Sequence, residues 1–132
     1  MTHVVVDTSA WMRRRQPQVG EALAGAIEED KVALTTPILL ELLRSAVGSR
    51  DAKALAVEYG FLARIPITRP VEARALEVQE RLTERGHHRG PSPVDLLAAA
   101  AAESVGAELW HCDRHFELIA EVTGQPVRRV GH

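Results

Sequence analysis

The sequence lacks the features that mark several specialised protein classes. Its single cysteine, Cys112, excludes an intrachain disulfide and a cysteine-rich zinc site. The longest apolar run, residues 96–102, is far shorter than the roughly 20 residues of a membrane-spanning helix. The first residues carry neither a basic segment nor a sustained apolar one, so no signal peptide is expected. These absences predict a cytoplasmic protein that has no membrane partner.

The sequence also has little excess charge of either sign. Its 132 residues include 16 basic and 18 acidic ones, and 45% are hydrophobic, which suits one domain spanning residues 1–132. Nucleic-acid-binding domains usually carry a basic excess. Net charge does not show where the charges lie, however, so this balance leaves a nucleic-acid partner open.

Short apolar runs alternate with helical stretches along the chain. Thr36 is expected to cap one helix with Pro37 at its first position, and Pro66 indicates an edge strand. The pattern predicts an α/β fold in which helices flank a central, mostly parallel twisted sheet of four to five strands. The expected strands are 4–6, 32–35, 64–68, 108–110 and 127–130; the expected helices are 19–29, 36–47, 52–62, 70–85, 94–105 and 113–122.

Four acidic residues, Asp7, Glu41, Asp95 and Asp113, lie just after predicted strands or in the helices that follow. Each alone has an ordinary explanation, as a helix-capping residue or an exposed helix residue. In a parallel sheet, however, all four would meet at one edge, where ligands bind. Crowded carboxylates repel each other unless a cation neutralises them, and oxygen ligands favour Mg²⁺ or Mn²⁺. Such a site suits phosphodiester hydrolysis by a metal-activated water.

Four motifs occur in order and carry a resemblance. They are VVVDTSAW at 4–11, TPILLELLR at 36–44, SPVDLLAA at 92–99 and LWHCDRHFELI at 109–119. Over essentially the whole chain, the sequence resembles the PIN-domain ribonucleases, and among them the VapC-type toxins of bacterial toxin–antitoxin pairs. The resemblance implies a PIN-like α/β/α sandwich.

The resemblance also implies roles for particular residues. Asp7, Glu41, Asp95 and Asp113 correspond to a catalytic quartet that binds Mg²⁺ or Mn²⁺, and Ser9, with Thr8 as the alternative, to a supporting hydroxyl. Implied partners are an RNA substrate of the tRNA or rRNA class, a cognate antitoxin whose tail occupies the active-site groove, and a second copy in a homodimer.

The sequence departs from the family pattern at one position. His115 stands where many relatives carry a further acid, two residues after Asp113. His115 has two candidate roles at the site, a contact to phosphate or a contact to a metal-bound water. The alternative is that it is an ordinary surface histidine. Glu117 is a further candidate for the site, with an exposed helix residue as its alternative.

RNA must also be held, and basic residues flank the motifs. Contacts from these residues to phosphate would give affinity without sequence specificity. The alternative for each basic residue is a solvated surface charge, and for Arg44 it is an ion pair with Glu41. Trp11 and Phe116 are expected in the core. The candidate RNA-binding residues are Arg13, Arg14, Arg15, Arg44, His88, Arg89, Arg114 and His115.

The leading hypothesis is therefore a metal-dependent endoribonuclease toxin that leaves a 5′-phosphate and a 3′-hydroxyl. One alternative is a phosphoryl-transfer domain with Asp7 as nucleophile, although the late lysine that such sites use is missing after Lys53. Another is a non-catalytic PIN-like module that binds RNA or metal. Without the four clustered acids, 14 of the 18 acidic residues remain against 16 basic ones, so the charge balance does not oppose an RNA substrate.

Overall fold

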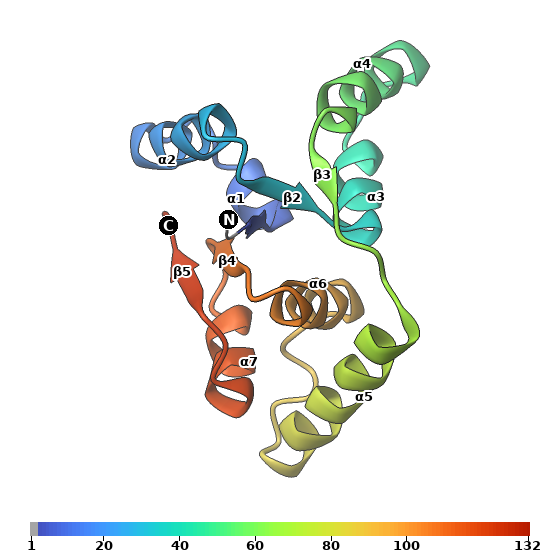
Figure 1. Cartoon of the computed structure of the whole chain (residues 1–132), viewed down its shortest axis with the longest axis vertical. Coiled ribbons are helices and arrows are strands. Elements are labelled where there is room, and N and C mark those ends of the chain that lie inside the picture. Colours follow the sequence, from blue (N-terminus) through green and yellow to red (C-terminus); the bar gives the residue numbers. More distant parts are fainter. Residues whose placement is uncertain (1–2) are drawn as a thin grey trace.

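The computed structural model describes residues 3–132 and has a five-stranded sheet at its centre (Figure 1). All neighbouring strands pair in parallel, in the order β3-β2-β1-β4-β5. This confirms the predicted α/β class. The strands are β1 (Val4–Val6), β2 (Val32–Leu34), β3 (Ala63–Arg64), β4 (Glu108–His111) and β5 (Val127–Arg129).

Helices cover the sheet on both sides. In Figure 1, α5, α6 and α7 lie below the sheet and α2 lies above it, while α3 and α4 lie beside β3. The single turn α1 was not predicted, because four residues are too few to show helical periodicity. The helices are α1 (Thr8–Trp11), α2 (Pro17–Glu28), α3 (Thr36–Arg44), α4 (Ser49–Gly60), α5 (Arg69–Glu84), α6 (Pro93–Ser104) and α7 (His115–Thr123).

The strand order places a change of direction between β1 and β4. From β1 the chain moves outward to β2 and β3, and then returns to the other side of β1 for β4 and β5. Val6 pairs with Trp110, and the backbone N–H of Asp7 donates to the carbonyl of Trp110 at 2.9 Å. In parallel sheets, a crevice forms where the strand order reverses. The residues that follow β1 and β4 therefore lie together at the edge where a ligand would bind.

The start of α3 differs by one residue from the prediction. Thr35, not Thr36, caps the helix, because its buried hydroxyl accepts from the N–H of Ile38 at 3.4 Å. Thr36 is already helical, and its hydroxyl accepts from Arg64 at 3.2 Å. Pro37 therefore occupies the second helical position, where its missing N–H also costs no helical hydrogen bond.

The edge strand β3 is confirmed in its place but is shorter than the predicted 64–68. It consists of Ala63–Arg64, after which the N–H of Ile65 still donates to Leu34 at 2.8 Å. Pro66 then has no N–H to donate, so the pairing with β2 ends there.

The core lies between the sheet and the helices. Val5 and Val6 of β1 are fully buried, as are most of the alanines of α6, whose short side chains let this helix approach β1 and β4 closely. Trp11 and Phe116 are 5% and 0% exposed, which confirms that they belong to the core. Within residues 3–132, no helix combines the length and apolar character needed to cross a membrane.

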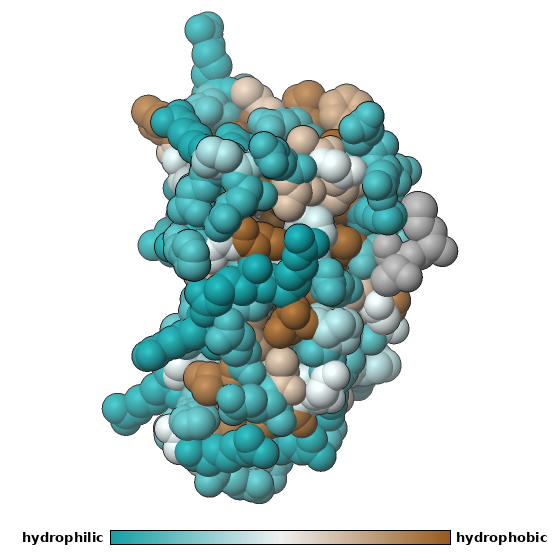
Figure 2. Space-filling view, turned by 90° about the vertical axis from the view of Figure 1, so that its left-hand side faces the viewer, coloured by the Kyte–Doolittle hydropathy of each residue, from teal (hydrophilic) through white to brown (hydrophobic). Residues whose placement is uncertain are grey.

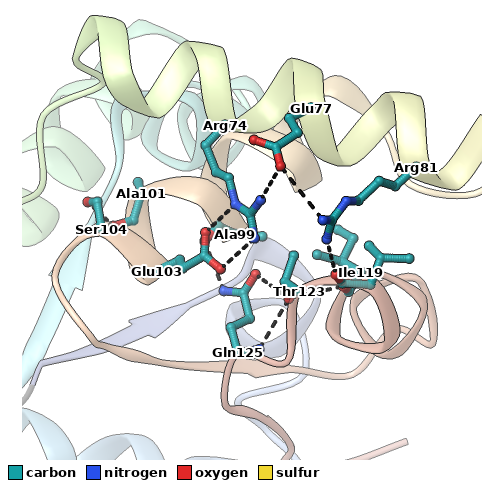
Figure 3. A network of polar contacts seen from close by, with 11 residues as sticks. Arg74, Glu77, Arg81, Ala99, Ala101, Glu103, Ser104, Ile119, Thr123 and Gln125 are labelled. Atoms are coloured by element: carbon teal, nitrogen blue, oxygen red, sulfur yellow. Dashed lines mark hydrogen bonds and ion pairs between the residues drawn. The ribbon is translucent and has the colours of Figure 1, made fainter.

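A polar network joins the three helices below the sheet (Figure 3). Arg74 of α5 donates twice to Glu103 of α6, at 2.7 and 3.1 Å, and once to Glu77 at 2.9 Å. Arg81 donates to the carbonyl of Val122 on α7 at 2.8 Å. Paired guanidinium and carboxylate groups thus fix α6, which carries one of the predicted site residues, against its neighbours.

Candidate active site

Asp7 is the most deeply buried of the four predicted acids. It follows β1 and is 3% exposed, and its Oδ2 accepts from the N–H of Ser9 at 3.0 Å, which caps α1. Its Oδ1 is buried and has no hydrogen-bond partner among the described residues. Burial, together with the charges of Asp95 and Glu41, raises the pKa of Asp7 to about 6. The ionised form of Asp7 therefore lacks a compensating positive charge.

Glu41 faces the site from α3. The hydroxyl of Thr8 donates to its Oε1 at 2.7 Å, across 33 residues of chain. Glu41 is half-buried, although Leu40 beside it is 62% exposed, so the apolar segment does not fully enclose the helix. The hydrogen bond thus orients the Glu41 carboxylate toward the end of β1.

Asp95 combines a structural role with its place in the site. Its Oδ2 accepts from the N–H of Ser92 at 2.8 Å, and its own N–H donates to the Ser92 hydroxyl at 3.1 Å. This reciprocal pair is a capping box that starts α6. Burial raises the pKa of Asp95, and the charge of Asp113 raises it too, whereas His115 lowers it.

Asp113 lies in the turn between β4 and α7. Its Oδ1 accepts from the backbone N–H of His115 at 3.0 Å, so α7 begins at His115 and not at the predicted residue 113. The imidazole Nδ1 of His115 lies 3.3 Å from Asp113 Oδ1 and 3.9 Å from Asp95 Oδ2. One ligand atom from each of these three residues lies within 4.8 Å of the others.

The structure therefore brings all four predicted acids to the carboxyl edge of the sheet. Among residues 3–132, no lysine or arginine nitrogen lies within 4.0 Å of any of their carboxylate oxygens. The unpartnered Oδ1 of Asp7 is what a cation would satisfy, and the donors are the oxygens that Mg²⁺ or Mn²⁺ prefers. The residues present thus fit a divalent cation. The four acids are Asp7, Glu41, Asp95 and Asp113.

A family model described as the PIN domain matches residues 4–122. The chain belongs to the PIN-domain family. Ribonuclease VapC18 of Mycobacterium tuberculosis is 40% identical over 127 residues, which cover 95% of this chain and 93% of that protein. Ribonuclease VapC2 of the same species is 39% identical, over 97% of this chain and 92% of that protein. These matches confirm the resemblance to VapC proteins.

A solved structure shows the same PIN-domain fold. The crystal structure of DNA-bound VapBC from Salmonella typhimurium matches with a TM-score of 0.76 at 20% identity, over 97% of this chain and 98% of that chain. At this identity the likeness concerns the fold alone. It agrees with the five-stranded parallel sheet and flanking helices described above.

The two predicted supporting hydroxyls of this PIN domain have different partners. Thr8 donates to Glu41, while the hydroxyl of Ser9 accepts from the backbone N–H of Cys112 at 3.0 Å. Thr8, which was the alternative to Ser9, thus contacts Glu41 of the quartet. Ser9 joins the turn after β1 to the turn after β4, and its side-chain hydrogen bond to Asp7 lowers the pKa of that carboxyl.

Two of the predicted RNA-binding arginines have partners within the protein. Arg13 donates to the backbone carbonyls of Ser9, at 2.9 Å, and His132, at 3.0 Å. Arg14 points to α4, where it lies 3.5 Å from a carboxylate oxygen of Glu58. The guanidinium of Arg13 thus supports the turn that carries Ser9.

The other RNA-binding candidates are more accessible. Arg44 is exposed and shares a shallow pocket with Thr8 and Glu41, yet it forms no ion pair with Glu41 in the described part of the chain. The remaining candidates with exposed side chains are Arg15, His88, Arg89 and Arg114.

Glu117, the further candidate for the acidic site, pairs with Arg129 at 2.8 Å instead of joining the quartet.

His111 is a residue near the site that the sequence did not single out. It is fully buried at the end of β4, where its Nδ1 accepts from the backbone N–H of Asp113 at 3.2 Å. Burial lowers the pKa of His111, and its Nε2 has no hydrogen-bond partner within residues 3–132. Its position two residues before Asp113 in a buried strand is the signal that could have found it.

Proposed function

We propose that this PIN-domain protein is a metal-dependent endoribonuclease that acts as the toxin of a toxin–antitoxin pair. The observation that carries this proposal is the buried Asp7 carboxylate, which has an unpartnered Oδ1 and lies among acids that lack a lysine or arginine partner. The relatives named ribonuclease VapC, which match along nearly the whole chain, support RNA as the substrate.

In this proposal, Asp7, Glu41, Asp95 and Asp113 hold Mg²⁺ or Mn²⁺. The cation supplies positive charge for the phosphate and lowers the pKa of a water. The chain itself positions the ligands: Thr8 orients Glu41, and the capping box orients Asp95. Oriented ligands bind a cation without first reorganising.

RNA would reach this edge between α3 and the 86–91 loop. We propose that Arg44 contacts phosphate, because its exposed guanidinium shares a pocket with Thr8 and Glu41. Such contacts give affinity without reading the base sequence. The other proposed phosphate contacts are His88, Arg89, Arg114 and Arg15. Arg13 and Arg14 are not among them, because each has a partner within the protein.

Asp95→Asn gives a direct test of the nuclease. Asparagine keeps an oxygen that accepts from Ser92 and so preserves the helix cap, but it removes the negative charge. We expect the purified protein to cleave structured RNA with Mg²⁺ or Mn²⁺, and Asp95→Asn to cleave at least about 100-fold more slowly. Glu77→Gln on α5, whose carboxylate pairs with Arg74 and is not part of the quartet, is the matched control and should keep full activity. Equal cleavage by Asp95→Asn and the unmodified protein would show that the quartet assignment is wrong.

The same purified protein also tests the two alternative functions, phosphoryl transfer and RNA binding without catalysis. An acid-stable phosphate on Asp7 after incubation with a phosphoryl donor would support the phosphoryl-transfer alternative. RNA binding without cleavage at any divalent cation concentration would support a binding module. Cleavage that stops when EDTA is added and resumes with Mn²⁺ supports the nuclease.

We also propose two protein partners, an antitoxin and a second copy of this chain. The exposed large apolar side chains include Val57 and Phe61 on and after α4, and Leu76 in a groove between α5 and α6. The face of α2 and β5 in Figure 2 shows only small hydrophobic patches between hydrophilic side chains. Exposed apolar patches commonly mark protein contacts. Light scattering of the protein alone, and of the protein coexpressed with the product of its neighbouring gene, measures both assemblies.

A further inference from the structure

Within residues 3–132, His115 is the one residue that adds a nitrogen atom to the group of possible metal ligands around Asp95 and Asp113. Its Nδ1 lies 3.3 Å from Asp113 Oδ1 and 3.9 Å from Asp95 Oδ2. Ligand atoms from these three residues lie within 4.8 Å of one another, close enough for one cation to contact all of them. Neither the helix cap of α6 nor the start of α7 requires the imidazole, because both use backbone N–H groups.

The structure also holds the imidazole ring in this orientation. A Cβ added to Gly90 would lie 3.3 Å from Cδ2 of His115 and 3.4 Å from Leu118, so the 86–91 loop packs against that edge of the ring. The side chain is 30% exposed, and its Nδ1 edge lies next to the two carboxylates. Packing on one edge thus directs the nitrogen on the other edge toward the acids.

A second observation points to a cation at this place. Asp7 is buried and leaves Oδ1 without a partner among the described residues, and its carboxylate is close enough for the charge of Asp95 to act on it. An unpaired buried carboxylate is costly unless a cation compensates it. Asp95 thus connects the buried Asp7 to the group of Asp95, Asp113 and His115, although the ligand atoms of Asp7 are not among those that lie within 4.8 Å of one another.

We propose that His115 is a ligand of the divalent cation and that its nitrogen makes this site favour Mn²⁺ over Mg²⁺. This inference rests on the proposed metal-dependent function. Mg²⁺ takes oxygen ligands almost exclusively and keeps a strict octahedral arrangement. Transition-metal cations accept imidazole more readily. A site with one imidazole among carboxylates thus gains affinity for Mn²⁺ that it does not gain for Mg²⁺.

A different role for His115 makes the opposite prediction. A protonated imidazole beside two carboxylates would serve as their counter-ion and would repel an incoming cation. Removing it would then strengthen the binding of Mn²⁺ and Mg²⁺ alike. The sign of the change in affinity therefore separates a ligand from a counter-ion.

Calorimetric titration with Mn²⁺ and with Mg²⁺ tests the proposal on the full chain. We expect His115→Ala to weaken Mn²⁺ binding about 10-fold or more while changing Mg²⁺ binding far less. His115→Asp, which makes the ligand set all oxygen, should shift the preference toward Mg²⁺. His3→Ala, at the opposite end of β1, removes an imidazole away from the site and should change neither affinity. Equal losses for the two cations, or gains for both, would overturn the proposal.

Pulsed electron paramagnetic resonance of bound Mn²⁺ gives a second readout that does not depend on RNA cleavage. A directly bound imidazole produces a nitrogen hyperfine coupling, which we expect in the unmodified protein and in His3→Ala but not in His115→Gln, which retains much of the side-chain size. Mn²⁺ that binds without this coupling overturns the role of His115 and leaves the metal-dependent nuclease intact. A protein that binds neither cation overturns both.

Discussion

Two groups of acidic residues in this protein have opposite surroundings. In the network below the sheet, Glu103 receives two hydrogen bonds from Arg74, and Glu77 a third (Figure 3). At the carboxyl edge of the sheet, Asp7 and Asp95 are more deeply buried, yet no arginine or lysine within residues 3–132 pairs with them. The more deeply buried acids thus have fewer positive charges beside them to compensate their negative charge.

This difference separates a structural charge cluster from a functional one. Paired charges hold α5, α6 and α7 together and need nothing further. Unpaired buried carboxylates destabilise the fold, and the pKa of Asp7 shows this by its rise to about 6. Perturbed acids at the point where the strand order reverses are typical of a functional site.

Glu41→Gln against Glu77→Gln should give the largest contrast between the two groups. Each change removes one negative charge and keeps the shape of the side chain. Because Glu41 belongs to the proposed metal site, we expect RNA cleavage to fall about 100-fold or more, whereas Glu77→Gln should change it little. Initial rates at saturating Mn²⁺ measure both. Comparable rates for the two variants would remove Glu41 from the site.

Glu103→Ala should have the largest effect on stability. It leaves the guanidinium of Arg74, which is 27% exposed, without its main partner. We expect a loss of roughly 2–3 kcal/mol in the free energy of unfolding, measured in urea. Metal affinity of the folded protein should not change. A loss below about 0.5 kcal/mol would mean that the pair contributes no more than a surface salt bridge.

Asp7→Asn should stabilise the metal-free protein. Folded Asp7 keeps its proton up to about pH 6, whereas the unfolded residue loses it near its ordinary value of 3.8. The folded state therefore binds more protons between these values, and stability falls as pH rises through this window. We expect a gain on the order of 2 kcal/mol for Asp7→Asn at pH 7 and none below about pH 4.

Mn²⁺ provides the matching control for this substitution. The cation should raise the melting temperature of the unmodified protein, because it compensates the buried charge, but should raise that of Asp7→Asn much less. A metal-free Asp7→Asn variant that is less stable than the unmodified protein at pH 7 would contradict the uncompensated charge.

Thr8→Val should give the smallest effect. It removes the hydroxyl that donates to Glu41 at 2.7 Å, which costs about 0.5–1.5 kcal/mol of stability. Thr123→Val, in the polar network, removes a hydroxyl that donates to the carbonyl of Ile119 and accepts from the backbone N–H of Gln125. Its stability loss should therefore be at least as large, but only Thr8→Val should reduce the rate of RNA cleavage. Equal cleavage rates would mean that the orientation of Glu41 does not limit the reaction.

Much of the fold follows from local sequence patterns. The valine run of β1 and the alternation of strands with helices predicted the parallel sheet. One error occurs where a local rule had two candidates. Thr35 and Thr36 are adjacent potential caps, and only the end of β2 decides between them.

The site acids could also be predicted, because strand ends in an α/β pattern identify positions without requiring contacts. The hydrogen bond between Thr8 and Glu41 could not be predicted, since it joins residues 33 positions apart. The same is true of the ion pair that draws Glu117 to Arg129 and away from the quartet. These contacts depend on how α1, α3 and α7 are placed around the sheet.

The sequence by itself determined which residue types the protein could bring to the edge of its sheet, because strand and helix periodicity are properties of short segments. Only the tertiary structure decided what surrounds each of them. It buried Asp7 without a counter-charge and brought His115 next to Asp95 and Asp113. The cost of an unpaired charge depends on the atoms around it, and those atoms come from elements that are distant in the sequence.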